Sequence, residues 1–386
     1  MRGSRLSAMA MAALLALAGC SAGLPQLPPR ARPDSRSDEA GLWLVAAKSE
    51  TALQQAPTAI GDPALNRYVR GVACKVAGPY CPDIRVYLVR EPGLDARMLP
   101  NGALQIGSGL LLRLRDEAQL AAVIGHELGH YVERHTFDKA WRQRVGSDIR
   151  AWLGILAQGL VGSGAGDAAD AVSPARDSAF SRSQEDAADA FGLRQMVVAG
   201  YAPAAAADFW RATVTELGER RSSIALRLLA RHPMPEARRD RLNAAVAAIA
   251  AQPSMRGYVR YQATLAPFRS AFLADEVRLR LPTETLGLFE RLRRQQGLDA
   301  TLAFYWGEVY RLRGWKDDRP QALRFYAEAS RLPGAPAALD RSIGLVRRGE
   351  SDWPAARAAF RRYLAAAPDA ADAAMIRAYL AEMPEA

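Results

Sequence analysis

The sequence predicts a mainly α-helical protein of the α+β class, with a small β-sheet in its N-terminal half and a solenoid of paired helices in its C-terminal half. Three observations support this fold class. Apolar residues recur with the helical period of about 3.6 over residues 62–76 and 116–134. Apolar and polar residues alternate over 84–89, as in a half-buried strand. Beyond about residue 266, similar residues recur 34 positions apart, which is the period of a two-helix repeat.

The N-terminus has the features of a bacterial lipoprotein signal. Arg2 and Arg5 precede an apolar stretch over residues 8–19, which is too short to cross a bilayer, where about 20 residues are needed. The stretch ends in Leu-Ala-Gly-Cys20, which resembles a lipobox, and the next residue is Ser rather than Asp. We therefore predict a signal peptide over 1–19 and a lipid on Cys20 in the outer membrane of a Gram-negative bacterium. An ordinary cleaved signal with an incidental Cys is the alternative.

Residues 20–40 are predicted to form a tether, because several prolines favour an extended backbone there. Export also permits disulfide formation. Once Cys20 carries lipid, Cys74 and Cys81 remain, and the Gly-Pro-Tyr between them suits a turn that lets the two thiols bond. Two buried free thiols are the alternative.

The first helix is predicted to start at Asp62-Pro63, since Asp caps helices and Pro is tolerated in their first turn. The strand over 84–89 follows, and a second strand over 104–107 is entered through a turn at Pro100-Asn101-Gly102. The helix over 116–134 begins with Asp116 as its cap.

Two further helices are expected over 184–198 and 235–251. The segment from Phe137 to Phe180 is predicted to be irregular, apart from a short amphipathic or buried helix over 149–161, which contains an Arg and is too short to span a membrane. Together these elements predict one domain over 41–251.

The C-terminal region, residues 252–386, is predicted to contain two or three tetratricopeptide-type repeats. Ala322 and Ala356 are 34 residues apart, and so are Tyr326 and Phe360. Trp306-Gly307 and the prolines at 333 and 368 also suit this repeat. An unrelated helical bundle with accidental spacing is the alternative.

The composition excludes several classes of protein. Hydrophobic residues make up 49% and charged residues 24% of the 386, so the chain is neither collagen-like nor disordered nor a polytopic membrane protein. The net charge of +10 comes almost entirely from Arg, and no run of five Lys or Arg occurs. A solvated basic surface is therefore favoured, and no nucleic-acid partner is expected.

The strongest chemical signal is His126-Glu127-Leu128-Gly129-His130. In a helix, positions i and i+4 share a face, so both His side chains can bind one Zn²⁺ while Glu127 lies beside them as a base. The chain has only four His, and a chance match at this spacing is the alternative. A catalytic zinc needs one more protein ligand than these two His, because such sites use three protein ligands and a water.

The predicted helix over 184–198 supplies candidates for the missing ligand. Glu185 can complete a site of two His and one Glu, and Asp189, four residues later on the same face, can accept the free ring N–H of a ligand His. Asp186 is a competing ligand, but it lies on a neighbouring face of the helix. An acidic pair of this kind is otherwise a solvated surface.

These motifs together resemble the HtpX/BepA/LoiP zinc metallopeptidases, relatives of the CAAX prenyl endopeptidases. The resemblance rests on the His126 to His130 motif, on Glu185 with Asp189, and on His232-Pro233 with Arg238, and it covers roughly residues 41–250. It implies a zincin-like fold, one Zn²⁺ per chain and endopeptidase activity. BepA-like members also join this domain to tetratricopeptide repeats.

The resemblance leaves several roles open. His232 either donates to an oxyanion or binds zinc and displaces the water, and a purely structural His is a third option. Arg238 holds a carboxylate near the cleft or lies at the surface. His135 is predicted to be an exposed or capping residue at the helix end.

The segment from Asp95 to Gly102 departs from the Asn-Ala-x-x-x-Pro-Gly-Gly pattern of the resembling proteins. In those proteins it leads to an edge strand beside the cleft, which we expect at Leu104–Gly107. An extended peptide added to that edge would be read through its backbone, which suits unfolded substrates.

The sequence thus predicts a periplasmic, outer-membrane-anchored zinc endopeptidase, with Glu127 as base and His232 beside it. Its expected substrates are misfolded or stalled envelope proteins, and its repeats are expected to recruit a protein partner. One alternative is a proteolytically blocked assembly factor or chaperone that works through the repeats. Another is a repeat scaffold whose zinc is structural.

Overall fold

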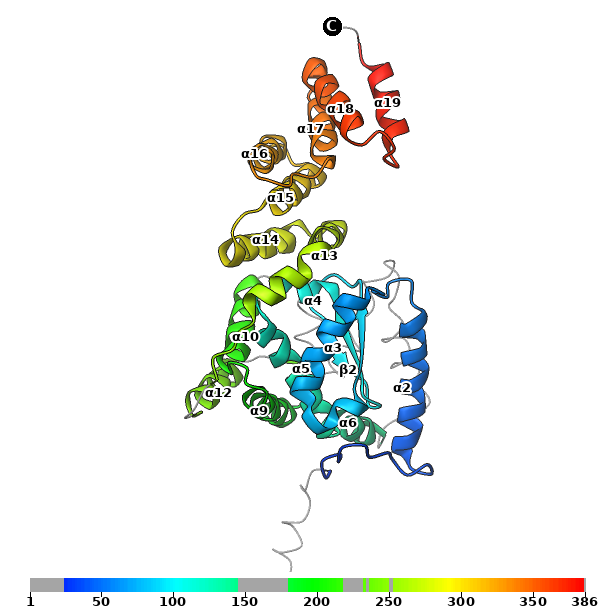
Figure 1. The fold of residues 1–386 in the computed structure, drawn as a ribbon, viewed down its shortest axis with the longest axis vertical. Helices are drawn as coiled ribbons and strands as arrows, with labels where there is room; N and C mark the ends of the chain where they lie inside the picture. Colours follow the sequence, from blue (N-terminus) through cyan, green and yellow to red (C-terminus); the bar gives the residue numbers. More distant parts are fainter. Residues whose placement is uncertain (1–23, 145–179, 218–231, 234–235, 250–252, 385–386) are drawn as a thin grey trace, which may run out of the picture.

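The computed structural model describes residues 24–144, 180–217, 232–233, 236–249 and 253–384. The predicted signal peptide, Cys20 and the expected helix over 149–161 lie outside these residues. Helices dominate the described part and accompany a three-stranded sheet, which confirms the mainly α-helical, α+β fold class. In Figure 1, helices α2 to α12 surround the sheet, and the C-terminal helices extend from them as an arm.

The N-terminal part contains the sheet and the helices around it. In chain order its elements are α2 (Asp38–Gln55), α3 (Pro63–Ala77), the 3-10 helix η1 (Gly78–Asp83), β1 (Arg85–Val89), β2 (Ala96–Met98), β3 (Ala103–Gly107), α4 (Ser108–Arg113), α5 (Glu117–Val132), α6 (His135–Arg144), α9 (Arg182–Val198), α10 (Ala204–Leu217) and α12 (Glu236–Ala247).

The C-terminal arm consists of helices in the described residues. They are α13 (Tyr258–Arg278), α14 (Pro282–Gln296), α15 (Ala300–Arg313), α16 (Asp318–Arg331), α17 (Ala338–Gly349), α18 (Trp353–Ala366) and α19 (Ala373–Glu382).

The predicted helix starts agree with the structure. Asp62 accepts hydrogen bonds from the backbone N–H groups of residues 64 and 65, and Asp116 accepts one from Gln119 N at 2.9 Å. These caps satisfy N–H groups that have no partner inside the helix. Helix α5 ends at Val132, and Arg134 follows with a φ of 58°, which turns the chain into α6.

The sheet has the strand order β1-β3-β2, so the central strand is β3. β1 and β3 run parallel, while β2 and β3 run antiparallel with Met98 opposite Leu104. The prediction of an edge strand at Leu104–Gly107 is therefore wrong. The short strand β2, which sequence reasoning left out, is the edge that lies next to α5.

Other elements also differ from the expectations. The segment from Phe137 was expected to be irregular, yet its first residues belong to helix α6, which ends at Arg144. Helices α2 and α10 were not predicted, and in α2 the apolar residues do not form one clear stripe along the helix.

The described part of the expected tether is docked on the domain. Leu27 is buried, its N–H donates to Val132 O at 2.8 Å, and its carbonyl accepts a hydrogen bond from Tyr80 at 3.0 Å. The carboxylate of Asp83 accepts from Arg30 N at 2.7 Å. This segment thus lies against the C-terminal end of α5 rather than extending freely.

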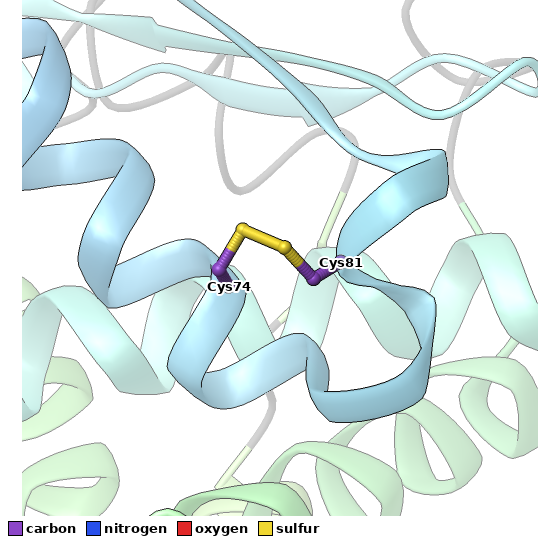
Figure 2. Close-up of a disulfide and its surroundings, with 2 residues drawn as sticks. All are labelled: Cys74 and Cys81. Atoms are coloured by element: carbon purple, nitrogen blue, oxygen red, sulfur yellow. A yellow bond between two sulfur atoms is a disulfide. The ribbon is translucent and has the colours of Figure 1, made fainter.

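Cys74 and Cys81 are joined by a disulfide with a bond length of 2.04 Å. The bond connects the last turn of α3 to η1, as Figure 2 shows. The covalent link closes the turn that leads from the helix into the sheet.

The arm is built from helices that pack in pairs. α15 packs on α16 and α17 packs on α18. Close packing explains two glycines, because a Cβ on Gly307 would lie 2.4 Å from the Tyr326 ring, and one on Gly344 would lie 2.4 Å from the Phe360 ring. The assignment of these pairs to the tetratricopeptide type stays a prediction.

A buried ion cluster joins the arm to the N-terminal part. Arg113 of α4 contacts Glu276 of α13 and Glu216 of α10, and Arg291 of α14 also contacts Glu216 at 2.6 Å. All four side chains are nearly inaccessible to solvent. Breaking a buried pair of this kind leaves an uncompensated charge, so the cluster holds α13 in place.

Within the described residues, no helix is both long and apolar enough to cross a bilayer.

Candidate metal centre

The site forms where α5 crosses α9. A Cβ on Gly129 would lie 2.8 Å from the Cα of Ala188, and one on Gly125 would lie 3.0 Å from the Cα of Gly192. Two helix backbones can approach this closely only where the contact residues are Gly or have very small side chains. The crossing places the His side chains of α5 directly against the acidic side chains of α9.

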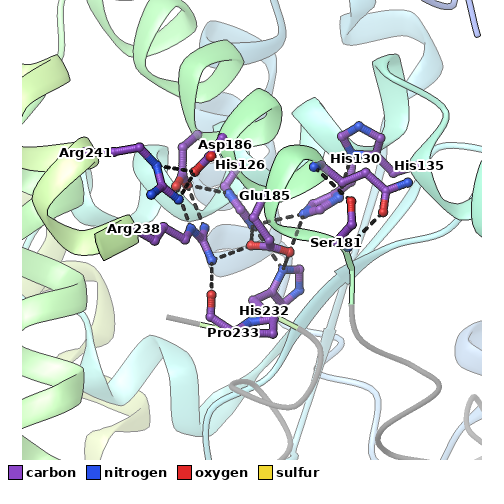
Figure 3. Close-up of polar contacts among 12 residues, drawn as sticks. His126, His130, His135, Ser181, Glu185, Asp186, His232, Pro233, Arg238 and Arg241 are labelled. Carbon is purple, nitrogen blue, oxygen red and sulfur yellow. Dashed lines mark hydrogen bonds and ion pairs between the residues drawn. The ribbon is translucent and has the colours of Figure 1, made fainter. Parts of the chain in front are cut away.

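His126, His130 and Glu185 converge at this crossing, as Figure 3 shows. The Nε2 atoms of the two His are 3.1 Å apart, and Glu185 oxygens lie 3.5 Å and 3.4 Å from them. Two nitrogens about 2.0–2.1 Å from one tetrahedral zinc would be separated by about 3.3 Å. The predicted pair of His ligands and the predicted carboxylate are thus brought together at a spacing that fits zinc.

His232 lies at the remaining corner of this cluster. Its Nδ1 is 3.1 Å from His126 Nε2 and 3.1 Å from Glu185 Oε1. The four potential ligand atoms all lie within 4.8 Å of one another, and all four side chains are buried. The structure therefore places His232 beside the other three side chains, and its role in the site stays a prediction.

The donor set itself favours a cation. His126 donates its Nδ1–H to Asp189, which leaves a lone pair on Nε2, and that lone pair faces the other ligand atoms. Lone pairs of several His and a carboxylate that converge in a buried site repel one another unless a positive charge lies between them. Imidazole nitrogen and carboxylate oxygen are ligands that zinc prefers, so the residues fit the metal.

Asp189 and Arg238 support the ligands from behind. Asp189 accepts from His126 Nδ1 at 2.9 Å, and Arg238 donates to both Asp189 oxygens at 2.7 and 2.8 Å and also contacts Glu185. Burial would raise the pKa of Asp189, but the hydrogen bonds from His126 and Arg238 outweigh it and hold this pKa at about 2. Arg238 is only 1% exposed, so the surface alternative for this residue is wrong.

The carboxylates also act on the His rings. Burial alone would lower the pKa of His126, but the hydrogen bond to Asp189 overcomes it, and the pKa of His126 is raised. Burial dominates at His130 and lowers its pKa well below the usual value. The pKa of Glu185 is lowered, because contacts with His130 and His232 outweigh its burial. Asp186 instead pairs with Arg241 at 2.9 Å on the exposed side of α9, so it does not compete as a ligand.

Glu127 points from α5 toward the sheet edge. Its Oε2 accepts the backbone N–H of Met98 in β2 at 3.0 Å, and its Oε1 lies 3.4 Å from His232 Nε2. The side chain is 4% exposed. One carboxylate oxygen is thus held by the edge strand while the other faces the metal cluster.

His135 is buried, at 7% exposure, so the prediction of an exposed or capping residue is wrong. The turn at Arg134 brings it back toward α5, where its Nδ1 lies 3.0 Å from His130 Nδ1. The spacing between His135 and the zinc motif does not predict this contact, because the contact depends on the direction of the turn at Arg134.

A pocket opens beside His126 and Glu127. Its other lining residues are largely apolar and come mainly from α4, α5, α9, α10 and α12, among them Val123, Leu193, Met196, Phe209, Trp210 and Leu242. Sequence reasoning missed Trp210, whose ring lies 5.3 Å from the Arg238 guanidinium, and Phe180, which stacks 4.0 Å from the His130 ring.

Comparison with known proteins agrees with this geometry. Residues 60–246 match peptidase family M48. The chain is 29% identical over 189 residues to a Vibrio cholerae protein named as a beta-barrel assembly-enhancing protease, which covers 46% of this chain and 38% of that protein. It is 25% identical over 195 residues to the beta-barrel assembly-enhancing protease of Escherichia coli, with the same coverage.

A mitochondrial relative matches as well. The metalloendopeptidase OMA1 of Arabidopsis thaliana is 35% identical over 119 residues, which cover 31% of this chain and 23% of that protein. The chain thus spans well under half of the length of these relatives. The residues that match the family, 60–246, contain the zinc motif. The His, Glu and His cluster and the match over residues 60–246 agree on one conclusion: this part of the chain belongs to peptidase family M48, whose members are zinc metallopeptidases.

Proposed function

We propose that the chain is a zinc-dependent endopeptidase in which His126, His130 and Glu185 hold the metal. The observation that carries this proposal is the convergence of these three side chains with Glu127 at the buried crossing of α5 and α9. A zinc ion held by these residues would lower the pKa of a coordinated water toward about 7 and would polarise the scissile carbonyl.

Glu127 is the proposed proton carrier. Its Oε2 is held by Met98 N, so Oε1 is the oxygen that accepts a proton from the attacking water. The same oxygen then donates this proton to the leaving amine, and the carboxylate returns to its starting state. Asp189 and Arg238 keep the ring of His126 in the tautomer that a ligand requires.

The substrate strand is proposed to add to β2. Leu99 N donates to Ala103 O and Gly107 N donates to Asp95 O, so the residues on either side of β2 bond to β3. By alternation Arg97, which lies opposite Gln105, faces β3 as well. The N–H of Met98 points the other way, to Glu127, and the N–H of Ala96 shares that side by the alternation of a strand. A peptide added there would lie along the catalytic carboxylate, and the apolar pocket beside it suits an apolar side chain that only an unfolded protein exposes.

The broader role is proposed from the relatives' names and the N-terminal motif. We propose quality control of misfolded or stalled envelope proteins, a location in the periplasm with a lipid anchor at Cys20 in the outer membrane, and recruitment of a protein partner by the C-terminal helices. Mass spectrometry of the N-terminal peptide from a membrane fraction tests the anchor. A diacylglyceryl-modified Cys20 is expected, and an unmodified peptide that begins elsewhere contradicts it.

Cleavage of an unfolded model protein by the zinc-loaded mature chain tests the activity. Glu127→Gln is the control, because the amide keeps its size and its bond to Met98 N but cannot carry the proton. Cleavage by the wild type alone is expected. Equal cleavage by both proteins contradicts the assigned role of Glu127.

A second candidate function follows from the position of His232. With Nδ1 at the fourth corner, this residue can complete a closed site of the kind that structural zinc uses, and the chain would then act as a blocked assembly factor or chaperone. With Nδ1 withdrawn, the ring instead offers an N–H to the oxyanion. If only His232→Ala cleaves the model protein, the wild-type site is blocked, whereas loss of cleavage in this variant supports the catalytic role.

A further inference from the structure

His135 stands outside the proposed ligand set but touches it. It is the first residue of α6, and the turn at Arg134, with a φ of 58°, directs its ring toward the last turns of α5. The rings of His130 and His135 meet edge to face, with centroids 5.0 Å apart and planes 70° apart. Their Nδ1 atoms are 3.0 Å apart, which is a hydrogen-bond distance.

The protons in this contact can be assigned from chemistry. His130 turns Nε2 toward Glu185 and His126, so a metal would be bound through that nitrogen and the ring proton would stay on Nδ1. The Nδ1–H of His130 then points at His135, whose Nδ1 must accept it. His135 is consequently neutral and carries its own proton on Nε2.

The two His ligands of α5 therefore have different partners behind them. His126 donates to the carboxylate of Asp189, while His130 donates to a neutral imidazole. Phe180 stacks on the His130 ring at 4.0 Å with planes 23° apart, so ring rotation is restricted by packing as well. Partners of this kind set the tautomer and orientation of a metal ligand.

We propose that His135 is a positioning residue of the metal centre, which orients His130 by accepting its Nδ1–H. The proposal rests on the proposed zinc site and adds a residue to it. It predicts that the acceptor atom of His135, rather than the bulk of its ring, is what the site requires.

Two variants separate these contributions. In His135→Asn, Oδ1 replaces Nδ1 as acceptor at the same distance from the backbone, whereas His135→Leu has a similar size and no acceptor. The zinc Kd of each full-length mature protein is measured by competition with a chelator. Leu is expected to weaken zinc binding by about 10- to 100-fold, and Asn is expected to stay within about threefold of wild type. Equal weakening by both variants, or no weakening by Leu, overturns the proposal.

A spectroscopic measurement on the wild type covers the case in which a variant does not fold. The chain has only four His, so ¹⁵N-labelled His gives few ring signals to assign in the zinc-loaded protein. A protonated Nδ1 on His130 and an unprotonated Nδ1 on His135 are expected. A proton on Nδ1 of His135 overturns the proposal. Neither readout uses proteolysis, so a chain that binds zinc without cleaving contradicts the proposed function and leaves this assignment standing.

Discussion

The substitution Gly129→Ala tests whether the close approach of α5 and α9 is what brings the site residues together. The added Cβ would lie 2.8 Å from Ala188 Cα and 2.9 Å from Ala188 O, while ordinary contacts begin at 3.4 Å. Both obstructing atoms belong to backbone, which cannot rotate away. The helices must therefore separate by roughly 0.6 Å or more, and this carries His130 away from Glu185.

A matched control isolates the packing energy. Gly71 lies in α3, and a Cβ there meets no heavy atom within 4 Å. Both substitutions gain about 1 kcal/mol of helix propensity, so the difference between them reports the overpacking, which is expected to be about 1–3 kcal/mol.

The assay is thermal unfolding of the two metal-free variants, followed by zinc Kd. For a domain of this size, each kcal/mol shifts Tm by about 2–4 °C, so Gly129→Ala should melt at least a few degrees below Gly71→Ala. It should also bind zinc more weakly, whereas Gly71→Ala should match the wild type. Equal Tm values and equal zinc affinities for the two variants would refute the close-crossing explanation.

Three further predictions follow. Ala96→Pro removes the outward N–H of β2 and no bond to β3, so kcat/KM for an unfolded substrate should fall about five- to tenfold at unchanged zinc affinity. The control Ala96→Ser should keep the wild-type rate. Equal rates for the two variants would exclude β2 as the substrate strand. Reduction of the disulfide opens the loop between Cys74 and Cys81, and denaturant titration should show a loss of about 2.5 kcal/mol. The pKa of Asp189 at about 2 is below its ordinary value, so its contribution of about 2 kcal/mol to the metal-free protein is present above pH 4 and lost as the pH falls toward 2. Asp189→Asn should be less stable than wild type at pH 6 and equally stable near pH 2, and a gap that persists at pH 2 contradicts this.

The sequence by itself determined what depends on neighbours within one helix. His126 and His130 share a face because four residues make about one helical turn, and Asp116 starts that helix because its side chain caps the free N–H groups. The same four-residue spacing predicts that Glu185 and Asp189 share one face of α9. Four residues of the site and the fold class could thus be predicted from spacing and periodicity.

Tertiary structure decided every feature that depends on how distant segments meet. The choice of β2 as edge strand follows from strand order, which alternation within a strand does not encode. His135 turns inward because Arg134 adopts a left-handed conformation, and sequence periodicity carries no information on that turn. His232 reaches the cluster from a segment 102 residues beyond His130, across the close crossing that Gly129 and its neighbours permit. Such contacts are set by backbone approach and packing over long sequence separations, which residue spacing within one helix or strand does not encode.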